Sequence, residues 1–262
     1  GLAQGRQTGI NNSEGEYIAF LDADDYFEID AVQKMYNAAI NNNADIVEIE
    51  SIRDGSIISS NYYGMLDAEI VLKDYLANGI PTMLWLRLYK RELFTPSVLP
   101  NLYTNNEDNF AIPCLLLKGK SIFFIKEVLH YYSSDNENAV MNVLEKNKVS
   151  EKYIKNRKMT LQIINHVEDY YGDMAKVYEK ELNKFFSRIV INYLMFDSSS
   201  YDYDKRIDDI ICNTKFTSER NVELFIKNNY VRRSLFSLLI RFLGLKKGVY
   251  YYKKIASLRR AS

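Results

Sequence analysis

Three aspartates follow an apolar run near the start of the chain, and their spacing suits metal chemistry. Asp22 and Asp24 lie two residues apart, directly after residues 17–21, and Asp25 comes next. The aromatic and branched residues of 17–21 predict a buried strand, and extended backbone would direct both side chains to one face. Carboxylates at the C-terminal end of a strand are ligands for Mg²⁺ or Mn²⁺ on substrate phosphates.

These aspartates also have two other interpretations. Aspartates after a strand often only form a turn, because the side chain bonds to nearby backbone, and two spaced aspartates alone are a weak motif. A calcium loop of the EF-hand type is excluded by position. Counted from Asp22, position six is Phe27 and position twelve is Gln33, where that loop requires Gly and Glu.

The elements around the aspartates predict an α/β fold. A helix should follow, with one apolar face made by Val32, Met35, Tyr36, Ala39 and Ile40. Three asparagines, residues 41–43, should end this helix, and residues 45–49 should form the next strand. The order strand, helix, strand predicts a parallel sheet with a right-handed crossover.

Three blocks of residues, in order, resemble family 2 glycosyltransferases of the GT-A fold. The first runs from Gly1 through Arg6, Thr8 and Gly9 to the aspartates; the second covers residues 85–94 and then 106–108; the third is His130, Tyr131 and Tyr132. The resemblance covers about residues 1–140. It implies an α/β fold, a partial GT-A (Rossmann-like) domain with a mixed or parallel sheet and helices, followed by a helical C-terminal region.

The resemblance also implies roles for particular residues. Asp22 and Asp24 match the motif that holds Mg²⁺ or Mn²⁺ on the donor diphosphate, and Asp25 would support them. Asp108 matches the catalytic base, and Arg6 matches an arginine on the nucleotide side. Trp85 and Glu107 would contact the acceptor. One departure is Gln7, because the family usually has Asn at that position.

Each of these residues also has a simpler interpretation. Asp108 could be a solvated loop acid among Asn105, Asn106 and Asn109. Trp85, the only tryptophan, could pack in the core rather than stack on a sugar. Arg87, Lys90 and Arg91 could meet phosphates, although solvated helix-surface charges are the default. His130 and His166 have no metal-ligand partners at usable spacing, so the sequence predicts no role for them.

The family begins with a strand, a helix and a second strand that hold the nucleoside, and this sequence starts at Gly1 without them. We therefore expect a fragment, or a gene product that has lost its first unit, and such a chain alone could be inactive. Its sheet would have an exposed edge that tends to associate.

Composition sets the remaining limits. The chain has 262 residues, enough for one large or two small domains, and we expect a catalytic part at 1–145 and a helical part at 146–262. Helical spacing runs over residues 148–196, with a break at Gly172 and an end at residues 198–200. Cys114 and Cys212 are too few for a disulfide framework, which fits a reducing cytoplasm. No apolar stretch is long enough to span a membrane.

The C-terminal tail, residues 227–262, is basic and apolar. It holds ten of the 34 Lys and Arg residues and none of the 34 acidic residues. This composition suits peripheral contact with the inner face of an anionic membrane, and the alternative is helices docked on the acidic body. Nucleic-acid binding is not expected, since no recognition motif accompanies the charges.

Together these features predict an inverting, metal-dependent hexosyltransferase. The donor would be a nucleotide sugar, namely a UDP-sugar, and the acceptor a glycan or a lipid-linked glycan in bacterial surface polysaccharide synthesis. A non-catalytic module that binds a glycan or a protein partner is the alternative. A nucleotidyltransferase, which also uses paired carboxylates and Mg²⁺, is a further one.

Overall fold

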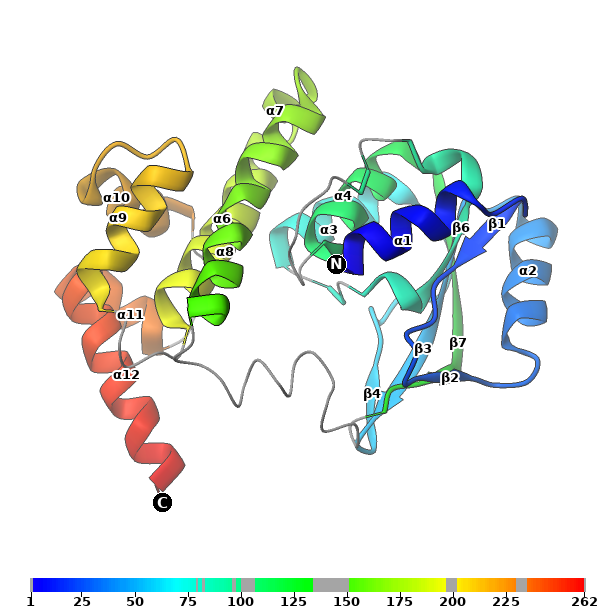
Figure 1. Cartoon of the computed structure of the whole chain (residues 1–262), viewed down its shortest axis with the longest axis horizontal. Helices are drawn as coiled ribbons and strands as arrows, with labels where there is room; N and C mark the ends of the chain where they lie inside the picture. Colours follow the sequence, from blue (N-terminus) through cyan, green and yellow to red (C-terminus); the bar gives the residue numbers. More distant parts are fainter. Residues whose placement is uncertain are drawn as a thin grey trace. The chain divides into compact units, whose positions relative to one another are not determined.

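The structure is a computed structural model, and it describes residues 2–78, 80–81, 83–95, 98–99, 107–133, 151–196, 202–229 and 235–261. The chain divides into two compact units, Gly1–Lys146 and Asn147–Ser262. The first unit contains a mixed sheet with helices, and the second is made of helices (Figure 1). Each unit is described by itself.

One sheet organises the first unit. Among the described residues its strands are β1 (Tyr17–Ala19), β2 (Tyr26–Phe27), β3 (Ile46–Arg53), β4 (Ser56–Ile58), β5 (Gly64–Asp67), β6 (Arg87–Lys90) and β7 (Ser121–Tyr131). The central order is β1-β6-β3-β7-β2, with β4 paired to β3 and β5 paired to β7. The pair β3/β7 is parallel, and the other pairs are antiparallel.

The strand arrangement corrects the predicted parallel pair. β1 and β3 run in the same direction, because both are antiparallel to β6, but β6 lies between them. A strand encoded about forty residues after β3 therefore separates the two strands that local order would have paired. Local order predicts which elements form, but pairing depends on segments distant in sequence.

The predicted strand at residues 17–21 is shorter than expected. β1 ends at Ala19, and Leu21 is 49% exposed. The backbone then turns, and the N–H of Asp25 donates to the carbonyl oxygen of Asp22 at 3.1 Å. The extended arrangement predicted for the aspartates is therefore wrong, because the backbone turns here, and their metal-binding role stays a prediction.

Helices cover the sheet, with α2 on one side and α1, α3 and α4 on the other (Figure 1). Their bounds are α1 (Leu2–Asn11), α2 (Ala31–Asn42), α3 (Ala68–Asn78) and α4 (Asp108–Lys118), and the 3-10 turns are η1 (Leu84–Leu86) and η2 (Arg91–Leu93). The asparagines end α2 as predicted, since Asn43 takes a left-handed conformation (φ 48°) as the C-cap, which Asn tolerates.

The buried face of α2 differs from the predicted one. Met35 and Ala39 are buried together with Ala31, and they pack against Val47 and Leu129 of the sheet. Val32, Tyr36 and Ile40 are exposed. The predicted face was too wide, because three small or flexible residues at i, i+4 and i+8 are enough to bury the helix.

Arg87 is also not the surface charge that was expected. It lies in β6 with its side chain fully buried, and its guanidinium is 2.6 Å from Oε2 of Glu48. It also donates to the backbone carbonyls of Met83 and Pro81. A buried charge needs such partners, so Arg87 holds the segment before η1 against β3 rather than meeting a phosphate.

The second unit confirms the helical prediction. Its helices are α6 (Glu151–Tyr171), α7 (Met174–Val177), α8 (Glu179–Met195), α9 (Tyr203–Asn213), α10 (Glu219–Asn229), α11 (Leu235–Leu243) and α12 (Leu245–Ala261). Gly172 ends α6 with a φ of +51°, a conformation that favours glycine. The predicted end at residues 198–200 lies outside the described residues.

Two further predictions can be compared with this structure. Cys114 and Cys212 are both free thiols, the first buried and the second exposed. Within the described parts of the chain, every helix is too short or too polar to cross a bilayer.

Candidate functional site

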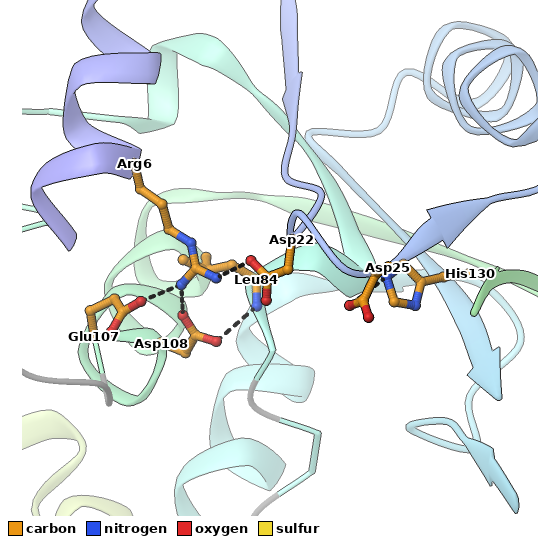
Figure 2. A network of polar contacts seen from close by, with 7 residues as sticks. All are labelled: Arg6, Asp22, Asp25, Leu84, Glu107, Asp108 and His130. Atoms are coloured by element: carbon orange, nitrogen blue, oxygen red, sulfur yellow. Dashed lines mark hydrogen bonds and ion pairs between the residues drawn. The ribbon is translucent and has the colours of Figure 1, made fainter. Parts of the chain in front are cut away.

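Arg6 joins three carboxylates from distant parts of the sequence. It lies on the buried face of α1, one turn from Ala3 and Ile10. Its guanidinium is 3.0 Å from Oδ1 of Asp22 and 2.6 Å from Oδ1 of Asp108, and it also contacts Glu107 (Figure 2). A planar guanidinium can hold several carboxylates in a fixed geometry, so Arg6 links the aspartate turn to the start of α4.

The turn at residues 22–25 directs its aspartates to different places. Asp22 points to Arg6, whereas Asp25 points to His130 (Figure 2). The side chain of Asp22 is 32% exposed, and it contacts Arg6 through Oδ1. Its other oxygen is left for a further ligand.

Asp108 and Glu107 begin α4, where the positive end of a helix dipole favours negative charge. Oδ2 of Asp108 accepts a hydrogen bond from the backbone N–H of Leu84 at 3.3 Å. The side chain of Asp108 is 19% exposed and that of Glu107 is 2% exposed. Asp108 is therefore not the solvated loop acid that the sequence left open.

Burial and mutual repulsion change the acidity of this pair. Burial raises the pKa of Glu107 to about 7, and the neighbouring charge of Asp108 adds to the rise. Burial likewise raises the pKa of Asp108, while Arg6 and the Leu84 N–H oppose that rise. Burial disfavours the charge of Arg6, but the three carboxylates, led by Asp108, raise its pKa. A carboxylate with a raised pKa is a stronger base than an ordinary one.

A second polar cluster lies on the other side of the aspartate turn. Oδ1 of Asp25 accepts a hydrogen bond from the N–H of Ser133 at 2.9 Å, and its Oδ2 is 3.3 Å from Nε2 of His130. Nδ1 of His130 is 2.9 Å from the hydroxyl of Ser51. Burial raises the pKa of Asp25 to about 6 and lowers the pKa of His130 to about 4. The imidazole is therefore neutral at pH 7.

His130 is the residue that sequence reasoning missed. Its ring stacks on Trp85, with centroids 4.0 Å apart and planes 12° apart. Its place in the third block of the resemblance was the available signal, but a lone histidine has no sequence partner that would reveal the contact with Asp25. The hydrogen bond from the N–H of Ser133 holds Asp25 at the end of β7, whereas the facing atoms of Asp25 and His130, Oδ2 and Nε2, lie 3.3 Å apart without a hydrogen bond.

The two residues expected on the acceptor side are both buried here. Trp85 is 4% exposed, and one face of its ring is occupied by His130. Glu107 is 1% exposed. Their acceptor-binding roles stay predictions, and those roles require both side chains to become accessible.

The structure offers two carboxylates, Asp22 and Asp24, at the predicted metal site. Asp22 and Asp24 lie on one turn, and no group of three or more His, Cys, Asp and Glu side chains within metal-binding reach occurs among the described residues. Two hard oxygen ligands fit Mg²⁺ when phosphates and water fill its other positions. The donor set therefore fits a metal that binds together with a diphosphate.

One hollow lies away from these residues. It has a volume of about 520 Å³ and is lined by residues that include Ile10, Asn11, Glu16, Lys90 and Phe94. None of the predicted site residues lines it, so it does not bear on the chemistry of the Arg6 network.

Comparison with known proteins places the chain. Residues 1–91 match the model of glycosyl transferase family 2. The glycosyltransferase GlyA of Streptococcus pneumoniae is 25% identical over 50% of this chain and 21% of its own length. The uncharacterized glycosyltransferase EpsJ of Bacillus subtilis is 26% identical over 80% of this chain and 64% of its own length. The chain thus spans less than two thirds of these relatives.

A solved structure shows the fold. S. aureus TarS 1-349, in complex with UDP-GlcNAc, matches 98% of this chain and 71% of its own chain with a TM-score of 0.60 and 15% identity. The mixed sheet covered by helices is thus the GT-A-like arrangement. Residues 1–91 are therefore similar to glycosyl transferase family 2, and the first unit has the GT-A-like fold.

Proposed function

We propose that this chain is the catalytic part of an inverting, metal-dependent hexosyltransferase. It would move a sugar from a nucleotide donor, a UDP-sugar, to a hydroxyl of a glycan or lipid-linked acceptor in bacterial surface polysaccharide synthesis. The observation that carries the proposal is the Arg6 network, in which one guanidinium contacts both Asp22 and Asp108. A donor-side carboxylate and a candidate base therefore lie at one place.

The proton transfer is assigned to Asp108. The acceptor oxygen forms a bond to the anomeric carbon while the bond from that carbon to the diphosphate oxygen breaks. The acceptor proton passes to the carboxylate of Asp108, and the diphosphate leaves with the electron pair. Attack from the face opposite the leaving group inverts the anomeric centre.

Arg6 and the Leu84 N–H position the base. They hold Oδ1 and Oδ2 of Asp108 respectively, so the carboxylate orientation is set before the acceptor arrives. Arg6 also balances part of the negative charge of Asp22, Glu107 and Asp108. Without the positive charge of Arg6, the three carboxylates would repel a diphosphate.

Asp22 and Asp24 are the residues that would hold Mg²⁺ or Mn²⁺. When bound, the metal supplies stabilisation for the negative charge that develops on the leaving diphosphate. Oδ2 of Asp22 lies outside the Arg6 contact. This arrangement supports the proposal, because the same aspartate can contact the arginine and a metal through different oxygens.

The choice of donor rests on similarity. TarS 1-349 has been crystallised in complex with UDP-GlcNAc and also with UDP. At 15% and 13% identity these structures share a fold with this chain, and we extend the uridine diphosphate to it as a proposal. GlyA and EpsJ come from bacteria, and the surface glycan as the acceptor is part of the proposal.

Titration calorimetry of UDP with Mn²⁺ tests the donor site. We would measure the chain as it stands, a version extended by the upstream sequence of its gene, and Asp24→Asn in each. Asp208→Asn is a matched control, because it removes the same charge from an exposed position on α9. We expect Asp24→Asn to abolish binding and Asp208→Asn to bind normally. If UDP with metal binds neither version, the donor site does not exist.

The reaction products separate the alternatives. With UDP-GlcNAc as the donor, a glycosyltransferase releases UDP, whereas a nucleotidyltransferase would release or consume pyrophosphate. Asp108→Asn should still bind UDP and should lose at least about a hundredfold in transfer rate, the lower range for a general base. A protein that binds a glycan but no nucleotide would be the non-catalytic module instead.

A further inference from the structure

The tip of the last helix pair exposes apolar side chains among basic ones. α11 and α12 are joined at Gly244, which has a φ of +79°. Phe242 is 82% exposed and Leu243 40% exposed, and Leu238, one turn earlier, is 52% exposed. Arg241, Lys246 and Lys247 are exposed within the same short stretch. We call residues 238–247 the basic–apolar tip.

The exposed residues are not a consequence of poor packing between the two helices. Phe236, Ile240, Leu245 and Val249 are buried, and the rings of Phe236 and Tyr252 lie 4.8 Å apart. Gly248 lies so close to Ile240 that a Cβ would come within 2.9 Å of its backbone. The inner face is thus already filled, and Phe242 points away from a closely packed hairpin.

The charges around the tip are positive. Lys246 is paired with Asp204 at 2.6 Å, and Glu223 is paired with Lys227 at 2.5 Å. Glu223 also accepts a backbone hydrogen bond from Leu245 at the start of α12. Arg241 and Lys247 have no acidic partner among the residues that the structure describes. Asp204 and Glu223 are thus each paired with a lysine, Asp202 and Glu219 also lie near Lys246, and Arg241 and Lys247 are the two further cations of the tip.

We propose that the basic–apolar tip docks on the surface of an anionic lipid bilayer. Phe242, with Leu238 and Leu243, would enter the headgroup region, while Arg241 and Lys247 would meet lipid phosphates. Aromatic and aliphatic side chains beside Lys and Arg are the features of interfacial helices, and each cation near such a surface strengthens binding. An anionic polysaccharide would use the charges but would offer no apolar layer for Phe242, Leu238 and Leu243.

This inference goes beyond the proposed transfer reaction and does not depend on the donor site. Under this proposal, each of the two interpretations of the tail that the sequence left open applies to a different face of the helices. One face of the helices is docked within its own unit. The other face, at the tip, is the proposed contact with lipid.

Vesicle co-sedimentation with the full chain tests the proposal. Vesicles of phosphatidylcholine alone are compared with vesicles that contain equal amounts of phosphatidylcholine and phosphatidylglycerol. We expect binding only to the anionic vesicles, with weaker binding in high salt. Phe242→Ser should weaken it by about tenfold or more, and Arg241→Gln with Lys247→Gln should weaken it by roughly fivefold per charge.

Matched controls lie at the other end of the same unit, where Figure 1 shows α7 far from α12. Val177→Ser removes an exposed apolar side chain (63% exposed), and Lys176→Gln with Lys180→Gln removes two exposed cations. These variants should bind as the parent does. Phe242→Leu should recover most of the binding that Phe242→Ser loses, and circular dichroism checks that each variant is folded.

Several outcomes would overturn the proposal. These are absence of binding, equal binding to both vesicle types, or a Phe242→Ser variant that binds like the parent. Binding to heparin that needs Arg241 and Lys247, with no such dependence for vesicles, would identify an anionic polymer as the partner. A change of oligomeric state in Phe242→Ser, measured by light scattering, would identify a second copy of the chain.

Discussion

Arg6 is the residue on which the candidate site depends most. It is 9% exposed, and its guanidinium forms ion pairs with Asp22, Glu107 and Asp108. Removing one member of a buried ionic group leaves the others uncompensated. Lys could not replace it, because a point charge cannot contact three carboxylates with the geometry of a guanidinium.

Glu107→Gln should change how stability depends on pH. Burial raises the pKa of Glu107 to about 7 from its ordinary value of 4.5, so the folded chain binds a proton that the unfolded chain has released between those values. The associated stability is present below pH 4.5 and is lost as the pH rises through 7. The variant should lose this dependence, a difference of about 2–3 kcal/mol at most.

Urea unfolding of both proteins at pH 4.5 and pH 7 measures this difference. His130 has the opposite sign, because its lowered pKa of about 4 gives stability that is present above pH 6.5 and lost as the pH falls towards 4. The contribution of His130 to the free energy of unfolding is the same in both proteins, so it cancels when they are compared. An equal change in the free energy of unfolding between pH 4.5 and pH 7 in both proteins would contradict the raised pKa of Glu107.

At the scale of elements, the α11–α12 hairpin depends on a close approach. Gly248→Ala should destabilise the chain by about 1–3 kcal/mol, as overpacking does, since its Cβ would lie 2.9 Å from the backbone of Ile240. Gly5→Ala on α1 is the matched control, because nothing lies within 4 Å of its Cβ. It should stabilise the chain by about 0.5–1 kcal/mol.

Thermal and urea unfolding of the two variants provides the test. Both changes replace a helical glycine by alanine, so helix propensity acts in the same direction in each. A Gly248→Ala variant as stable as Gly5→Ala would show that the two helices can separate at no cost.

Features of the helices and strands that depend on neighbouring residues were predicted better than features that depend on distant parts of the chain. The end of α2 at its asparagines and the break at Gly172 were confirmed, since capping depends on the residue itself. The buried face of α2 and the length of β1 were predicted less well. Those features depend on how much of each element the sheet covers, and that information lies elsewhere in the chain.

At the scale of the whole molecule, each unit has its own core. Met35 is fully buried against the sheet in the first unit, and Phe186 is buried among the helices of the second. Trp85, the only tryptophan, reports on the first unit alone, while far-ultraviolet circular dichroism reports helices of both. Domains with separate cores need not unfold together.

Phe186→Ala should therefore lower the stability of the second unit by about 3–5 kcal/mol. The thermal unfolding transition of this variant should shift mainly when it is followed by circular dichroism, and less when it is followed by Trp85 fluorescence. Met35→Ala should lower the free energy of unfolding of the first unit by about 2–5 kcal/mol. The unfolding transition followed by Trp85 fluorescence should shift accordingly. Equal shifts of both signals in both variants would show that the units unfold as one.

The sequence by itself indicated the resemblance to family 2 glycosyltransferases, the α/β and helical parts, and Asp22, Asp24 and Asp108 as the candidate residues for chemistry. Those features are carried by short motifs and by local periodicity. The tertiary structure alone decided that Arg6 contacts Asp22 and Asp108, that His130 faces Asp25, and that Arg87 is buried. These contacts join residues far apart in sequence, and no local pattern records which strand lies beside which.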